Sequence, residues 1–205
     1  MSENGSTRKV REATHSGIFY PEDPSALAST IAGLFEAVPE TEARRALGIV
    51  SPHASIEYSG DLSALAWKAS AGRKLARIVI LAPLHRSQEP AIFLPESSLF
   101  ESPLGAMEVD ERAIAGLMDC GTFYVVNDIP HFEEHGIEVQ LPFARTLYPK
   151  ARIVPILLGR ATLPVVKSLA TGLRLVFGAE KQSTLFVVSS DLAFARSPSE
   201  SSRLS

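Results

Sequence analysis

Three polar side chains follow apolar runs that are suited to buried strands. His53 and His85 each come shortly after one such run, and Asp191 comes shortly after a third. Because ligands of an open parallel sheet bind beyond the carboxyl ends of its strands, we expect these three groups to share one crevice. Two imidazoles and a carboxylate suit a transition metal such as iron, copper or zinc. The alternative is that each residue only caps or terminates its strand, and spacing alone leaves both interpretations open.

A second cluster, Glu133–Glu138, stands at the start of a predicted helix. His135 and Glu138 are three residues apart, so they share a helix face and are our candidate catalytic residues for binding a ligand or transferring protons. The alternative is that acidic residues gather in a first helical turn because the helix dipole favours them there. We predict that both side chains face the crevice of the two strand-end histidines.

The elements that must position these residues alternate between strands and helices, which predicts an α/β fold. The sheet is expected to be mainly parallel or mixed, with helices on both faces. We predict a single domain over residues 1–194 and a disordered polar tail over 195–205. The predicted strands are 46–51, 77–82, 91–94, 152–158 and 184–189, and the predicted helices are 24–39, 61–69, 110–118, 137–148 and 163–175.

Composition and charge exclude several classes of protein. The 205 residues are 45% hydrophobic and carry a net charge of -3, so no electrostatic attraction to nucleic acid or an anionic membrane is expected. The apolar runs are shorter than the roughly 18 residues of a membrane span, and no signal peptide is evident. The single cysteine, Cys120, cannot form an intramolecular disulfide, and we expect it to be buried packing. These features predict a soluble, cytoplasmic protein.

Six ordered segments between residues 13 and 192 resemble motifs of the Memo family. This family is protein B of the AmmeMemoRadiSam system and is related to the LigB-type class III extradiol dioxygenases. The segments are HSGIFYP at 15–21 (family A-G-x-F-Y-P), PHASIEYSG at 52–60 (P-H-A-G-Y-x-Y-S-G), APLH at 82–85 (G-P-x-H), SPLG at 102–105 with Val-Asp at 109–110 (T-P-L-G, then V-D), EHGIEVQLPF at 134–143 (E-H-S-x-E-V-Q-L-P-F) and VVSSDL at 187–192 (V-S-S-D-L).

The resemblance implies a Memo/LigB-like fold with a dioxygenase-type pocket. Its metal positions would map to His53 and His85, and Asp191 and Glu134 would line the same pocket as further metal candidates. LigB relatives use non-haem iron(II), and Memo proteins are linked to copper and iron. Microbial versions accompany a radical-SAM protein and an AMMECR-type domain protein, which the resemblance implies as partners.

Departures from the family motifs lower the metal binding and the activity that we expect. The family's third histidine is Phe194 here, and we expect the usual C-terminal portion, with its cysteine, to be lacking. We therefore expect iron(II) or copper to be weakly bound, and we favour a non-catalytic Memo-like protein that self-associates through an uncovered sheet edge. The alternative is a metal-dependent oxidoreductase of the extradiol dioxygenase type, with His135 as its acid–base group.

Overall fold

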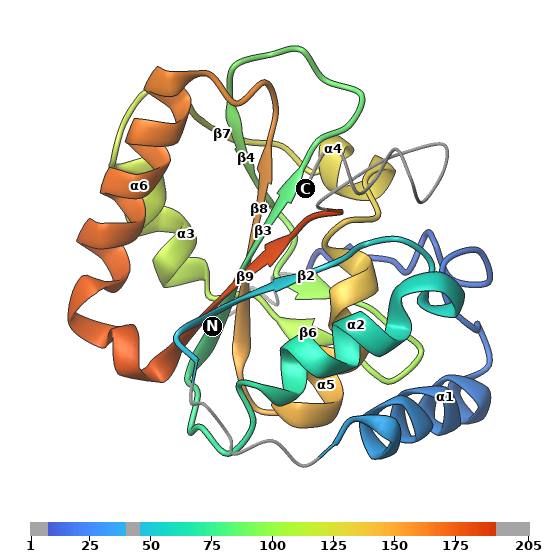
Figure 1. The fold of residues 1–205 in the computed structure, drawn as a ribbon. Coiled ribbons are helices and arrows are strands. Elements are labelled where there is room, and N and C mark those ends of the chain that lie inside the picture. The colour runs from blue at the N-terminus through green and yellow to red at the C-terminus, as the bar shows by residue number, and fades with distance from the viewer. Residues whose placement is uncertain (1–7, 40–45, 192–205) are drawn as a thin grey trace, which may run out of the picture.

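A six-stranded sheet forms the centre of the computed structural model, which describes residues 8–39 and 46–191 (Figure 1). All neighbouring strands are parallel except β4 and β8, so the sheet is mixed. From one edge to the other, the strands are β2 (Gly48–Ser51), β9 (Thr184–Ser189), β3 (Arg77–Pro83), β8 (Arg152–Leu158), β4 (Ile92–Leu94) and β7 (Tyr124–Val126).

The middle strands were predictable because both of their faces are covered. A strand that is buried on both faces is a continuous apolar run without alternation. Ile78, Val79 and Ile80 of β3 follow this rule, since all three are fully buried. The predicted strands at 152–158 and 184–189 are confirmed at both ends, and the strand predicted at 77–82 ends one residue later, at Pro83.

Helices cover both faces of the sheet, as the sequence predicted. In Figure 1, α3 and α6 pack together on one face, and α1, α2 and α5 pack together on the other. The fold is therefore α/β and consistent with a Memo/LigB-like architecture. The helix bounds are α1 (Pro24–Ala37), α2 (Ile56–Lys68), α3 (Glu111–Met118), α4 (Ile129–Glu133), α5 (Leu141–Leu147) and α6 (Leu163–Phe177), with 3-10 turns η1 (Glu138–Gln140) and η2 (Gly178–Ser183).

Two predicted helices differ from the structure by more than two residues, whereas the other three agree to within two residues at each end. The helix expected at 137–148 is divided into η1 and α5, because Pro142 has no N–H to continue the hydrogen-bond ladder and instead occupies the first turn of α5. The helix expected at 61–69 begins at Ile56, immediately after the turn at Ser55. Both differences lie next to the segments that carry the candidate site.

A small second sheet was not predicted. It joins β1 (Val10–Arg11), β5 (Leu99–Phe100) and β6 (Met107–Glu108), and strands of two residues are too short for a recognisable apolar pattern. Its parallel β1–β5 pairing fixes the N-terminal segment against the rest of the domain. The strand β7 and the helix α4 were also missed.

Strands β2, β9 and β3 are parallel neighbours, so their carboxyl ends meet at one edge of the sheet. His53, Asp191 and His85 follow these three ends. In the described part of the chain, none of the helices has the length and apolarity needed to cross a membrane.

Candidate metal centre

Three histidine rings meet at the carboxyl edge of the sheet. The ring centroids lie 5.1 Å apart for His53 and His85, and 5.3 Å from each of these to His135. One nitrogen from each ring can be chosen so that all three lie within 4.8 Å of one another. Nitrogens that share one ion at about 2.0–2.1 Å lie within about 4 Å of each other. Small ring movements would therefore bring all three onto a single ion.

The carboxylate of Glu134 contacts Nδ1 of two of these rings. One carboxylate oxygen accepts hydrogen bonds from Nδ1 of His85 at 2.9 Å and from its backbone N–H at 3.0 Å. The other oxygen lies 3.0 Å from Nδ1 of His135 and accepts from the backbone N–H groups of His135 and Gly136. Burial alone would raise the pKa of Glu134, but the hydrogen bonds from His135, His85 and Gly136 outweigh it and hold the pKa well below its usual range.

The ionised carboxylate fixes the tautomer of both rings. Because an ionised Glu134 can only accept, Nδ1 of His85 must carry the hydrogen, and the carboxylate oxygen 3.0 Å from Nδ1 of His135 favours the same tautomer there. The lone pair of each neutral ring is then on Nε2, the remaining nitrogen. A carboxylate behind a histidine is the usual device for orienting a metal ligand.

Ser189 orients the ring of His53 in the same way, through Nδ1. Its hydroxyl donates to the backbone oxygen of Gly136 at 2.6 Å, so its oxygen is left to accept. It accepts from Nδ1 of His53 at 3.2 Å and from the Gln140 amide at 3.1 Å. Burial lowers the pKa of His53, which keeps the ring neutral, although the nearby Asp191 opposes the shift. The contacts at Nδ1 leave Nε2 of each ring as the nitrogen whose lone pair can bind a metal.

Asp191 borders the cluster with one oxygen that accepts no hydrogen bond from the described residues. Its Oδ1 accepts from the backbone N–H groups of His53 at 2.9 Å and Ala54 at 3.3 Å, which fixes the turn after β2. Its Oδ2 lies 3.8 Å from Nε2 of His53. The predicted convergence of Asp191, His53 and His85 is thus present, with His135 as a third imidazole.

Glu138 is turned into the protein and not toward an open crevice. Its side chain is fully buried and accepts hydrogen bonds from Arg11, Thr14, Tyr20 and both the backbone and Nδ1 of His15. Burial would raise the pKa of Glu138, but the Arg11 guanidinium and the hydrogen bonds lower it. Glu138 therefore anchors the N-terminal segment beside the histidine cluster.

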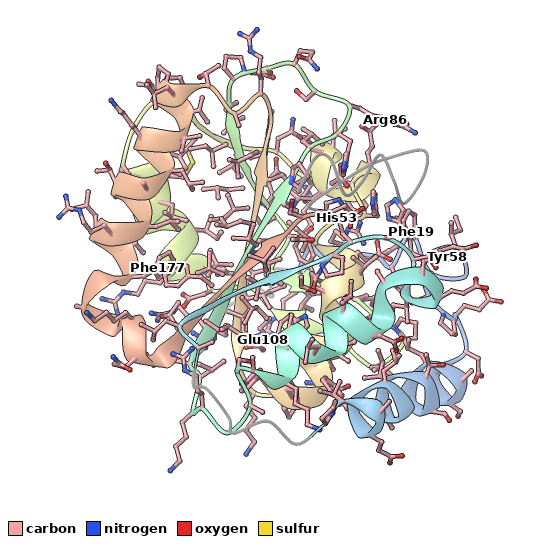
Figure 2. The ribbon with its side chains drawn as sticks, viewed as in Figure 1. Phe19, His53, Tyr58, Arg86, Glu108 and Phe177 are labelled. Atoms are coloured by element: carbon pink, nitrogen blue, oxygen red, sulfur yellow. The ribbon has the colours of Figure 1, made fainter. Side chains whose placement is uncertain are left out.

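The anchored segment supplies a wall of the site. Phe19 stacks on His135 with ring centroids 4.2 Å apart and planes inclined by 20°, and His15 lies 5.8 Å from the same ring. Figure 2 shows His53 and Phe19 in this region, with Arg86 toward the solvent. A cavity of about 290 Å³ lies here, and it is lined by His15, Phe19, Leu84, His85, Arg86, Glu133, Glu134 and His135.

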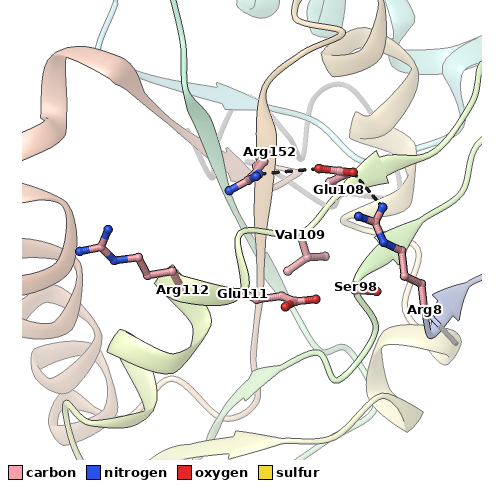
Figure 3. A pocket seen from close by; sticks show the side chains of 7 residues that line it. All are labelled: Arg8, Ser98, Glu108, Val109, Glu111, Arg112 and Arg152. Atoms are coloured by element: carbon pink, nitrogen blue, oxygen red, sulfur yellow. Dashed lines mark hydrogen bonds and ion pairs between the residues drawn. The ribbon is translucent and has the colours of Figure 1, made fainter. Parts of the chain in front are cut away.

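A second hollow, of about 260 Å³, lies at the start of β8 near Arg152 (Figure 3). Glu108 pairs there with Arg8 at 2.9 Å and with Arg152 at 3.7 Å. Exposed ion pairs of this kind contribute little to stability, and these two occupy three of the charged side chains that line the hollow. We assign no site to this hollow.

Sequence reasoning missed several contributors to the histidine site. His15, Phe19 and Ser189 lie in quoted motifs, but nothing in their spacing assigns them to the cluster. His135 was expected as an acid–base group, whereas the structure groups it with the two strand-end histidines. Phe194 and the predicted tail at 195–205 lie outside the described residues.

Comparisons with known proteins agree with this architecture. The profile of the family described as "Memo-like protein" matches residues 11–198. A "MEMO1 family protein" of Aeropyrum pernix is 31% identical over 195 residues, covering 90% of this chain and 69% of the relative. A Thermotoga maritima relative is 31% identical, with 89% and 69% covered, and one from Thermoplasma volcanium is 29% identical, with 80% and 61% covered. The chain thus spans 61–69% of the length of these relatives. It belongs to the Memo-like family.

Proposed function

We propose that this Memo-like protein binds one divalent transition-metal ion through Nε2 of His53, His85 and His135. The single observation that carries the proposal is that Nδ1 of every ring in the cluster lies within 3.2 Å of a fixed oxygen, of Glu134 or Ser189. The three free lone pairs are thereby oriented before any ion arrives. In this proposal Glu134 orients ligands and is not itself a ligand, because N–H groups occupy both of its oxygens.

Three neutral imidazoles suit iron(II), copper or zinc, and none of these donors is the thiolate that selects softer ions. Divalent affinity is expected to rise from iron(II) to copper(II) and to fall again at zinc. When bound, such an ion would polarise a ligand oxygen and lower the pKa of a coordinated water. Phe19 would keep bulk water from one side of His135, and Asp191 would offer an acceptor beside His53.

We favour a metal-binding role without catechol cleavage. The non-haem iron oxygenase arrangement of two histidines and one carboxylate needs a carboxylate oxygen directed at the ion. Glu134 does not provide one, and the remaining candidate, Asp191, uses one oxygen to hold the turn after β2. The alternative, a metal-dependent oxidoreductase of the extradiol dioxygenase type, is favoured by the cavity beside His85 and His135 and by the second oxygen of Asp191.

The first test is the metal content of protein purified without added ions. Anaerobic titration with iron(II), copper and zinc should then give one site per chain. Changing His53, His85 or His135 to Ala should each weaken binding strongly. His15→Ala is the matched control, because its ring faces the same cavity and its Nδ1 also bonds a carboxylate. Wild-type affinity in His135→Ala would show that this ring is not a ligand.

The oxidoreductase alternative and the proposed partners need separate tests. Ring cleavage of a catechol by the iron(II)-loaded chain, lost in Asp191→Asn, would favour the alternative. Membership of the AmmeMemoRadiSam system is a proposal from family resemblance. It is tested by copurification with a radical-SAM protein and an AMMECR-type domain protein from the same cell.

A further inference from the structure

Gly136 lies at the centre of the hydrogen bonds that orient the cluster. Its N–H donates to Glu134 at 3.1 Å and its carbonyl accepts from Ser189 at 2.6 Å. A Cβ at this position would lie 3.0 Å from Cβ of Ala82 and 3.5 Å from both Glu134 Oε1 and Nδ1 of His53. Its φ is outside the left-handed region, so the absent side chain matters here for space and not for backbone conformation.

The methyl group of Ala82 cannot move aside to make room for such a side chain. It is 2% exposed and is held in β3 opposite Leu157 of β8. A methyl group has no rotamer to change, so the contact could be relieved only by a backbone shift of a few tenths of an ångström. The shift would fall on the end of β3, which leads to His85, or on the segment that carries His135.

A shift of that size matters for metal binding. In a formed metal site the metal–ligand distances fall within about 0.2 Å of their typical values. A backbone shift of a few tenths of an ångström, which would be harmless elsewhere in the core, is therefore large compared with the spread of distances in a metal site. The contact lies between the two segments whose histidines must converge.

We propose that Gly136 and Ala82 form a size-matched pair that sets the spacing of the three imidazoles, with Gly136 as a positioning residue. The inference rests on the proposed metal site.

The test compares Gly136→Ala, Ala82→Gly and the double variant in cobalt(II) affinity and visible absorption. Gly136→Ala should weaken binding about 10-fold or more and alter the spectrum, as expected for displaced ligands. The double variant should return to within about twofold of wild type, because the two changes share one contact. The matched control is Gly33→Ala on α1, where a Cβ would meet nothing within 4 Å.

Two outcomes would overturn the inference. One is wild-type affinity and spectrum in Gly136→Ala, and the other is a double variant as weak as Gly136→Ala alone. Thermal unfolding of each variant separates loss of the site from loss of the fold. If the wild-type protein binds no metal, the proposed function fails. The imidazole NMR signals of the metal-free protein still test whether Gly136 and Ala82 set the positions of the rings. They should shift in Gly136→Ala and recover in the double variant, and unchanged signals would refute the pair.

Discussion

Glu134 accepts a hydrogen bond from Nδ1 of His85 at 2.9 Å, and its other oxygen faces Nδ1 of His135 at 3.0 Å. One buried carboxylate thus orients two imidazoles from segments that are far apart in the sequence. The orientation of these two rings depends on a single anion and not on a separate partner for each, whereas His53 has its own partner in Ser189.

Glu134→Gln tests this dependence. A carboxamide has one acceptor oxygen and one donor nitrogen, so it can accept from only one of the two imidazole N–H groups. The other ring must turn or change tautomer, which moves its lone pair away from the common centre. We expect metal affinity to fall about 10–100-fold. Isothermal titration of Glu133→Gln, which alters an exposed carboxylate of the same cavity, gives the control, and equal affinities in both variants would contradict the orienting role.

Glu138→Gln distinguishes an anchor from an acid–base catalyst. The change leaves the Arg11 guanidinium buried, 1% exposed, without its counter-charge. Breaking a buried pair in this way typically costs about 3–5 kcal/mol. We expect a loss of that order in the free energy of unfolding in urea, with Glu12→Gln, exposed in the same segment, close to wild type. A variant of wild-type stability would mean that Glu138 does not anchor the N-terminal segment.

The parts of the fold that sequence predicted are those that follow from local pattern. The strands β3, β8 and β9 are apolar runs, and α3 begins after an Asp110 side chain that caps it by accepting from Ala113. Short strands such as β1 have no such pattern, because tertiary pairing with β5 creates them.

The candidate site divides in the same way. Parallel strands place His53 and His85 at one edge, and this was expected from their position after strands. The place of His135 depends on its contacts with Glu134 and Phe19, which have no periodic signal in the sequence. The roles of Glu134 and Glu138 depend on which donors surround each carboxylate, which spacing along the chain does not encode.

Self-association is expected through the β2 edge of the sheet. Val50 on this edge strand and its register partner Val188 on β9 are 48% and 39% exposed. Unpaired strand edges with exposed apolar side chains promote association. Light scattering should show a mass that increases with concentration, and Val50→Lys should reduce it. Val166→Lys on α6, where the valine is 42% exposed, should not. A monodisperse wild-type monomer would refute this prediction.

The last prediction concerns His131, which is buried away from the metal site. It is 2% exposed, packs edge-on against Phe100, and within the described chain neither ring nitrogen has a hydrogen bond of normal geometry. Burial lowers the pKa of His131 to about 3. Asp128 and a weak backbone interaction at Phe93 oppose this shift, and Arg11 adds to it. The folded protein therefore holds this imidazole neutral where an unfolded chain would protonate it.

The sign of the pH dependence follows from this difference. Between about pH 6.5 and 3 the unfolded state binds a proton at this imidazole and the folded state does not. The free energy of unfolding therefore falls as the pH falls, by at most about 1.4 kcal/mol per pH unit. His131→Leu cannot take up that proton and leaves no polar nitrogen unpaired. Urea unfolding at pH 8, where both proteins are neutral at this position, measures the packing difference alone. From pH 6 to pH 4 the stability of the variant relative to wild type should rise progressively above its value at pH 8. Protonation of the buried carboxylates lowers the stability of both proteins alike. Parallel stability curves over this range would show that His131 does not carry the acid sensitivity.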